Sequence, residues 1–274
     1  MQQTRDAARA KAAATYNAAA DHFDAPPLAF WDRIGSRTIE RLAPEAGACI
    51  LDVGCGAGAS ALPAARAVGP EGRVIGVDLA EALLERARCR AERFGLRNAA
   101  FRCGDMTALD LPDASFDAVV CVFAIFFVPD MEAQVAELWR LVRPGGRLAI
   151  TTWGPDAFEP GSAAFWDAVR RVRPDLDNDF RPWDRISEPD EVVRLFLDGG
   201  ATAPEAVAEP GAQPLAEAED WWTIALGSGF RGTIDLLSPD EARRVREAKL
   251  ACLRRERVKE MTANALHAIA RKPS

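Results

Sequence analysis

Residues 50–59 read Ile-Leu-Asp-Val-Gly-Cys-Gly-Ala-Gly-Ala, and this stretch decides the fold. Its apolar first half is typical of a short buried strand. The glycines at 54, 56 and 58 predict a sharp turn in which no Cβ atom stands between a ligand and the main chain. The alanine-rich segment 60–68 is expected to be a helix, and its first N–H groups would face a ligand over the turn. The stretch therefore indicates a ligand site between a strand and a helix.

Beyond this turn, strand-like and helix-like segments alternate. Strands are expected at 49–53, 74–77, 99–103, 116–122 and 147–152, with helices between them at 60–68, 80–94 and 131–141. This order predicts an α/β fold with a doubly wound, mostly parallel sheet. Ligands of such sheets bind outside the carboxyl ends of the strands.

Helical patterns flank the core on both sides. Two helices are expected before it, at 5–20 and 28–42, and further helices after it at 162–172, 188–197, 217–224 and 239–258. Two weaker strands, 205–209 and 263–270, are expected to complete a seven-stranded sheet as a closing β-pair at its edge, with a helical insertion between them. We thus predict one domain in three parts: N-terminal helices (1–44), a ligand-binding core (45–155) and a cap with the closing pair (156–274).

Composition narrows the class of protein. The chain has 274 residues, 49% of them apolar, and a net charge of −7, which argues against a nucleic-acid partner. Six cysteines without a CxxC pair and only two histidines predict buried thiols and no metal site. Without an apolar run of 18 residues or a signal-peptide pattern, we expect no membrane association and a cytoplasmic location. Monomer and homodimer both stay open.

Three acidic residues lie at or near the ends of the expected strands. Asp78 is placed to accept both hydroxyl groups of a ribose, the alternative being a helix N-cap. Asp52 lies within a buried strand and needs a partner, either N–H groups of the turn or a cation on the ligand. Asp105 can accept from an exocyclic amine such as adenine N6 while Met106 covers the ring; the alternative is a turn aspartate.

These motifs together resemble the class I S-adenosylmethionine-dependent methyltransferases, whose fold is Rossmann-like, and within them the small-molecule group of the ubiquinone and menaquinone type. The resemblance covers about residues 45–155. The matching motifs are Leu51-Asp52-Val53-Gly54-Cys55-Gly56-Ala57-Gly58, Asp78, Gly104-Asp105-Met106, Leu111-Pro112-Asp113-Ala114-Ser115-Phe116-Asp117 and Leu141-Val142-Arg143-Pro144-Gly145-Gly146-Arg147-Leu148. Upstream, Tyr16-Asn17 and His22-Phe23-Asp24 look like the lid of that group.

The resemblance implies S-adenosylmethionine as cofactor and S-adenosylhomocysteine as its product. The turn 54–58 would hold the methionine end, Asp78 the ribose, and Asp105 with Met106 the adenine, while Cys121 would offer its backbone carbonyl to the amine. The residues expected to bind the cofactor are Tyr16, Asp52, Gly54, Cys55, Gly56, Gly58, Asp78, Leu79, Gly104, Asp105, Met106 and Cys121.

The segment 126–130, Phe-Phe-Val-Pro-Asp, departs from the family, because many relatives have one or two histidines before the Pro-Asp. This leaves an apolar wall without an obvious base. His22 is therefore the candidate base, with a capping or surface role as the alternative. The residues expected to line the acceptor pocket are Phe126, Trp153, Trp222 and Arg231. Packing of the cap is the alternative for the aromatic residues, and a solvated loop for Arg231.

The segment from Arg243 to Arg257 is rich in arginine, includes Lys249, and has glutamates between its positively charged residues. This pattern predicts a solvated face of an amphipathic helix rather than a nucleic-acid patch.

The motifs predict metal-independent transfer of a methyl group to an oxygen, nitrogen or carbon atom of a small, partly apolar acceptor. Catalysis would rest mainly on holding the reactants for in-line displacement. An NAD(P)-dependent oxidoreductase shares the glycine turn and Asp78, but Asp52, Asp105 and the lack of a Tyr-x-x-x-Lys motif count against it. A protein that binds the cofactor without catalysis is the other alternative.

Overall fold

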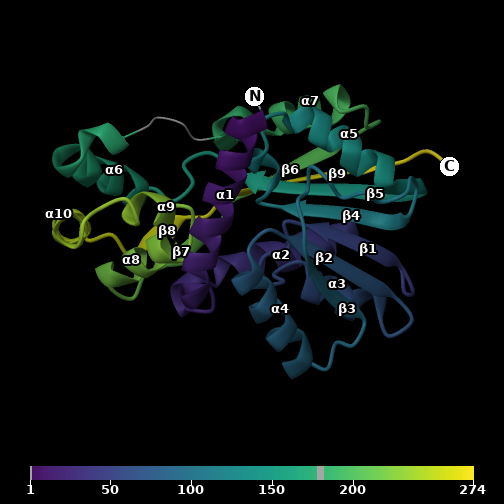
Figure 1. The fold of residues 1–274 in the computed structure, drawn as a ribbon, viewed down its shortest axis with the longest axis horizontal. Helices are drawn as coiled ribbons and strands as arrows, with labels where there is room; N and C mark the ends of the chain where they lie inside the picture. The colour runs from purple at the N-terminus through teal and green to yellow at the C-terminus, as the bar shows by residue number, and fades with distance from the viewer. Residues whose placement is uncertain (1, 178–181) are drawn as a thin grey trace.

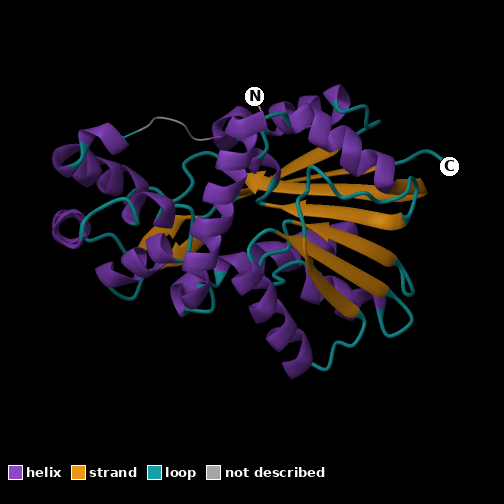
Figure 2. Ribbon diagram, viewed as in Figure 1, coloured by secondary structure: helices purple, strands orange, loops and turns teal. Residues whose placement is uncertain are grey.

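The computed structural model describes residues 2–177 and 182–274, with residues 2–8 described by their backbone alone. A seven-stranded sheet forms its centre, in the order β3-β2-β1-β4-β5-β9-β6 (Figures 1 and 2). The parallel strands are β1 (Cys49–Val53), β2 (Arg73–Asp78), β3 (Ala99–Cys103), β4 (Phe116–Val122) and β5 (Val142–Trp153). The antiparallel strand β9 (Ala265–Arg271) lies between β5 and β6 (Glu205–Glu209). The predicted sheet and its closing β-pair are confirmed.

Two hydrophobic clusters cover the two faces of this sheet. Alternate side chains of a strand point to opposite faces, so Ile50 packs with α2 (Phe30–Leu42) and α3 (Ala61–Val68), whereas Leu51 faces the opposite side. That second face is covered by α5 (Met131–Leu141) and α7 (Pro189–Asp198), and α4 (Glu81–Arg93) packs along β3. None of the helices in the described ranges is long and apolar enough to cross a membrane.

The fifth strand is longer than the sequence pattern predicts. Phe116 pairs with Val142, but Ala118 pairs with Arg147, so the residues between carry a bulge inside β5 rather than a turn before it. The bulge absorbs the Pro-Gly-Gly segment, which a regular central strand cannot hold.

A cap lies beside the sheet, on the left of Figure 1. Its helices are α6 (Gly161–Val172), α8 (Ala218–Leu226), α9 (Arg231–Ile234) and α10 (Pro239–Arg255), and β7 (Ala212–Pro214) pairs with β8 (Glu260–Thr262) beneath them. The three longer helices were predicted, whereas α9 and the β7–β8 pair were not. The rings of Phe165, Trp221 and Phe230 form the centre of the cap.

The prediction that the basic run on α10 is solvated is wrong for one residue. Lys249 is completely buried, its Nζ donates to the Gly161 carbonyl at 2.9 Å, and its ammonium group lies over the ring of Trp221. Burial lowers the pKa of this amine well below its ordinary value. Its aliphatic stem and amine thus join α10 to the start of α6.

The N-terminal helix α1 (Gln2–Ala19) packs between α4 on one side and α9 of the cap on the other (Figure 1). Two short 3-10 turns, η1 (Ala20–His22) and η2 (Pro26–Leu28), connect it to α2.

We expect the folded protein to lose stability in acid because of the buried side chain of His267. This β9 side chain is buried, and its Nδ1 lies 3.1 Å and 3.2 Å from the hydroxyl oxygens of Thr151 and Thr38. Burial lowers its pKa from 6.5 to about 4, so between these values only the unfolded chain binds the proton. The side chain should therefore remove about 3 kcal/mol of stability as the pH falls from 6.5 to 4.

Urea unfolding of the wild type and His267→Gln at pH 7 and pH 4.5 measures this effect. The difference between the two proteins isolates His267 from carboxyl groups that titrate in the same range. The wild type should lose more stability on acidification than the variant; equal losses would contradict the prediction.

Candidate active site

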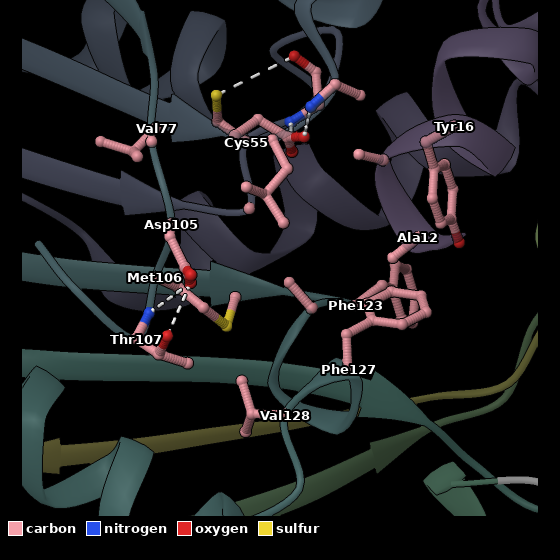
Figure 3. Close-up of a pocket in the computed structure, with 18 of the residues that line it drawn as sticks. Ala12, Tyr16, Cys55, Val77, Asp105, Met106, Thr107, Phe123, Phe127 and Val128 are labelled. Atoms are coloured by element: carbon pink, nitrogen blue, oxygen red, sulfur yellow. Dashed lines mark hydrogen bonds between the residues drawn. The ribbon is translucent and has the colours of Figure 1, made fainter. Parts of the chain in front are cut away.

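A cavity of about 590 Å³ opens at the carboxyl ends of β1 to β4, beneath α1 (Figure 3). Its walls come from three stretches of the chain, within residues 9–31, 54–83 and 104–137. The volume lies in the range of small-molecule sites. The edge of the sheet is also the place where the strand order predicts a ligand.

The glycine turn forms the floor of this cavity. The N–H groups of Gly54 and Cys55 donate to the Val77 carbonyl at 2.8 Å and 3.1 Å, which fixes the turn against the end of β2. Gly54 has a φ of 72°, and a Cβ atom added there would overlap the Cβ of Ala124 after β4. The turn is thus held between two neighbouring strands.

Asp78 joins this turn to the start of α4. Its Oδ2 accepts from the Gly56 N–H and its Oδ1 from the Ala80 N–H, both at 2.8 Å. Each carboxylate oxygen has a further acceptor position, so a pair of ribose hydroxyls can still be bound. Burial raises the pKa of Asp78, against the effect of these bonds. The N-cap of α4 is Ala80, so the alternative of an Asp78 N-cap does not describe this helix.

Asp52 lies behind the wall of the cavity. Ser60, which lines the cavity, donates from Oγ to Asp52 Oδ2 at 2.7 Å. The other oxygen, Oδ1, is buried and has no hydrogen-bond partner in the described part of the chain. Burial raises the pKa of Asp52 to about 7, although the bond from Ser60 works in the opposite direction. This carboxyl group therefore has an unfilled capacity for a positive partner.

Asp105 lies across the cavity from Tyr16 and Phe127 in the view of Figure 3. Its Oδ1 accepts from the N–H and hydroxyl of Thr107, both at 2.8 Å, and its Oδ2 pairs with Arg9 of α1 at 3.0 Å. These bonds outweigh the effect of burial and lower the pKa of Asp105. The neighbouring Met106 carbonyl accepts from Gln134 Nε2 of α5 at 2.8 Å. The loop after β3 is therefore fixed by both α1 and α5.

Aromatic rings enclose the rest of the cavity. Tyr16 of α1 meets Phe127 edge to face, with 5.5 Å between the ring centroids (Figure 3). Phe123, which follows β4, has a φ of 54° and lines the cavity with Trp31 and Phe23. Left-handed backbone is rare for a bulky residue and is found where a site requires a particular side-chain direction. Four of these aromatic residues were not among the site residues expected from the sequence: Phe23, Trp31, Phe123 and Phe127.

Most residues expected to bind a cofactor come together at this cavity. Those that line it are Tyr16, Gly54, Cys55, Gly56, Asp78, Leu79, Gly104, Asp105 and Met106. Three others, Asp52, Gly58 and Cys121, lie outside its lining. Burial raises the pKa of the Cys121 thiol, which faces the core rather than the ligand site.

The residues expected to carry catalysis or to bind the acceptor are placed elsewhere. His22 does not line the cavity, and its Nδ1 is buried without a partner in the described part of the chain. Phe126 packs into the core against Trp183, and Trp153 stacks behind Phe123 with 3.9 Å between the ring centroids.

The two cap residues are likewise away from the cavity. Trp222 packs against the core from α8, and Arg231 bonds to Asp235 and to the carbonyl of Ala18. Among residues 138–177 and 182–274, none lines the cavity, so the described part of the cap does not supply its wall.

In the described ranges, three or more His, Cys, Asp or Glu side chains nowhere gather as metal ligands would. The six cysteines are all free thiols, as expected, but the expectation of buried thiols is wrong for Cys89 and Cys103, which are exposed.

The family comparison agrees with this geometry. Residues 50–146 match the family model of the methyltransferase domain. The glycine turn, the strand-end carboxyl groups and the sheet order belong to the same stretch. Over residues 50–146 the chain therefore matches a methyltransferase domain, in agreement with the family that the motifs resemble.

Individual relatives extend the comparison. Nocamycin O-methyltransferase from Saccharothrix syringae is 37% identical over 129 residues, 47% of this chain and 46% of that protein. Aklanonic acid methyltransferase DauC from Streptomyces sp. (strain C5) is 35% identical over 130 residues, 47% of this chain and 59% of that protein. The chain thus spans about half the length of the curated relatives it matches. The solved structure of YcgJ from Bacillus subtilis shares the fold, with a TM-score of 0.58, 22% identity, and coverage of 88% of this chain and 99% of that one.

Proposed function

We propose that this protein transfers a methyl group from S-adenosylmethionine to a small, partly apolar acceptor, without a metal. The observation that carries the proposal is the set of carboxyl groups around the glycine turn. Asp78 keeps acceptor capacity beside the turn, and the buried Asp52 has an oxygen without a partner. Ribose hydroxyls on a ligand match Asp78, which lines the cavity, and a positive charge on the ligand matches the carboxyl group of Asp52, which lies behind the cavity wall and acts through Ser60. The residues present thus fit this cofactor.

The roles of the residues follow from their places. The turn 54–58 would hold the methionine end, and Asp52 would act on it through Ser60, whose Oγ gives its proton to Asp52 and keeps its lone pairs for a cation. Asp78 would take the ribose, and Asp105 and Met106 the adenine. When bound, the cofactor supplies a methyl group on a positively charged sulfur.

The acceptor would lie against the aromatic wall of Phe23, Trp31, Phe123 and Phe127. Burial raises the pKa of Tyr16 well above its usual value, so this phenol keeps its proton and is no base at neutral pH. The placement of His22 also gives no support to its proposed role as a base. We therefore favour acceptors that ionise readily by themselves, such as phenols, enols or carboxylic acids, with the protein acting by positioning and exclusion of water.

Oxygen is the first acceptor atom to test, because the Saccharothrix syringae relative is an O-methyltransferase. We also propose a cytoplasmic enzyme whose partner is this small molecule rather than a nucleic acid, in keeping with the net charge of −7.

Titration calorimetry with S-adenosylmethionine, S-adenosylhomocysteine and NAD tests the cofactor. S-adenosylmethionine and S-adenosylhomocysteine should both bind. NAD should give no measurable heat, because the site has Asp52 and Asp105 in addition to Asp78, whereas a dinucleotide site of an oxidoreductase needs only the acid at the position of Asp78. Tight NAD binding without S-adenosylmethionine binding would refute the proposal.

Incubation with methyl-labelled cofactor and a panel of phenols, enols and carboxylic acids then tests the transfer itself. Label should enter at least one oxygen acceptor. Binding without transfer to any acceptor class, including amines and carbon acids, would favour a cofactor-binding protein without catalysis.

A further inference from the structure

We propose that residues 227–232 of the cap are a positioning segment for α1: they hold Tyr16 over the cavity, and the cap thereby controls ligand retention without touching the ligand. This segment reads Gly-Ser-Gly-Phe-Arg-Gly and links α8 to α9. The retention part of the proposal rests on the proposed cofactor; the positioning part does not.

The main chain of this segment lies directly against the N-terminal helix. A Cβ atom added to Gly232 would come within 2.7 Å of Thr15 Oγ1, and one added to Gly229 would contact the Tyr16 hydroxyl at 3.7 Å. Thr15 is itself buried. Such close approach leaves no room for a side chain at position 232, so the contact fixes the height of α1 above the cavity.

Arg231 adds a polar contact at the end of α1. Its Nη1 donates to the Ala18 carbonyl at 3.3 Å, and its Nε pairs with Asp235 at 2.6 Å. Carbonyl groups in the last turn of a helix lack partners within it, and a cation is favourable there. Arg231 was expected to line the acceptor pocket or to lie in a solvated loop; instead it contacts the helix that carries Tyr16.

The segment is anchored firmly enough to act as a support. Phe230 is buried between Trp221, Phe165 and Phe158, with ring centroids 5.0 Å, 5.1 Å and 5.4 Å away. The cap core therefore fixes Phe230, whose neighbours on either side contact α1.

The helix itself needs this support. Most residues of α1 are small or polar, so its own burial of apolar surface is limited, and helices depend on tertiary packing for stability. On the side of α4, Asn17 Oδ1 accepts from the Ala82 N–H at 2.9 Å, and Arg9 forms an ion pair with Asp105. A partly exposed ion pair contributes little to stability, so the contact with the cap is the stronger of these two.

Hydrogen exchange of α1 amides tests the positioning. Gly232→Ala places a methyl group against Thr15 Oγ1 and should speed exchange of residues 12–19 by about tenfold, with β1 and β4 unchanged. The double variant Thr15→Ala/Gly232→Ala removes the opposing hydroxyl and should restore slow exchange. Arg243→Ala, on the exposed face of α10, is the matched control and should change nothing. Unchanged α1 exchange in Gly232→Ala, or no rescue in the double variant, would overturn the proposal.

The dissociation rate of S-adenosylmethionine, measured by stopped flow on the same variants, tests retention. Gly232→Ala should release it about tenfold faster, and the double variant should restore the wild-type rate. Faster α1 exchange with an unchanged dissociation rate would overturn control of retention. If the wild type binds no S-adenosylmethionine, the proposed function fails, whereas the exchange experiment still decides the positioning.

Discussion

Replacing Asp78 with alanine is expected to weaken S-adenosylmethionine binding by about ten- to a hundredfold, or about 1.5–3 kcal/mol. The variant loses a charged acceptor for the ribose hydroxyls. It also leaves the N–H groups of Gly56 and Ala80 without their partner, so the bonds from Gly54 and Cys55 to the Val77 carbonyl must hold the glycine turn against β2 without the help of Asp78. Titration calorimetry of both proteins measures the change.

The controls separate binding from folding. Asp78→Asn keeps one oxygen acceptor and should lie between the wild type and the alanine variant. Glu81→Ala, on the first turn of α4, removes a nearby acid that does not line the cavity and should bind as the wild type does. An alanine variant that folds and binds with unchanged affinity would rule out the ribose role of Asp78.

Among substitutions that add a single methyl group to the cavity floor, Gly54→Ala should destabilise the protein most. The new Cβ would overlap the Cβ of Ala124, and the φ of 72° adds the strain of left-handed backbone. Overpacking and backbone strain together should cost about 2–5 kcal/mol of stability. Cofactor binding should fall below detection, because the turn and the loop after β4 must separate.

Gly47→Ala is the matched control for this prediction. Gly47 has a φ of 81°, but no atom lies within 4 Å of an added Cβ, so only the backbone strain remains. Its cost should be about 1–2 kcal/mol, with cofactor affinity unchanged. Equal losses of stability in the two variants, measured by urea unfolding, would show that the contact with Ala124 has no effect.

The fold was predictable because its signals are local. The strand patterns of β1 and β4 are nearly all apolar, and the glycine turn marks where the first strand ends, so order and direction follow from the alternation of strand and helix. The site acids Asp78 and Asp105 were predictable for the same reason: they stand at strand ends, and parallel strands bring their ends to one edge.

The acceptor side was not predictable, because it depends on which way neighbouring side chains turn. In the short 3-10 turn after β4, Phe126 enters the core and Phe127 faces the cavity, yet the two residues are identical in sequence terms. Phe123, just before this turn, has a left-handed backbone conformation that a phenylalanine in the sequence does not predict. The burial of Lys249 was not predicted for a similar reason. The helical periodicity of α10 does not reveal that Trp221 of α8 packs against the face that carries Lys249.

The sequence by itself therefore determined the α/β sheet, the glycine turn and the carboxyl groups around it, since these depend on periodicity, backbone freedom and strand-end position. Only the tertiary structure decided that the described residues of the cap line none of the cavity and instead pack behind α1. That contact joins residues about 200 positions apart in the sequence. It also requires a glycine at position 232, and the reason for that requirement is visible only in the structure, where Thr15 lies directly opposite Gly232.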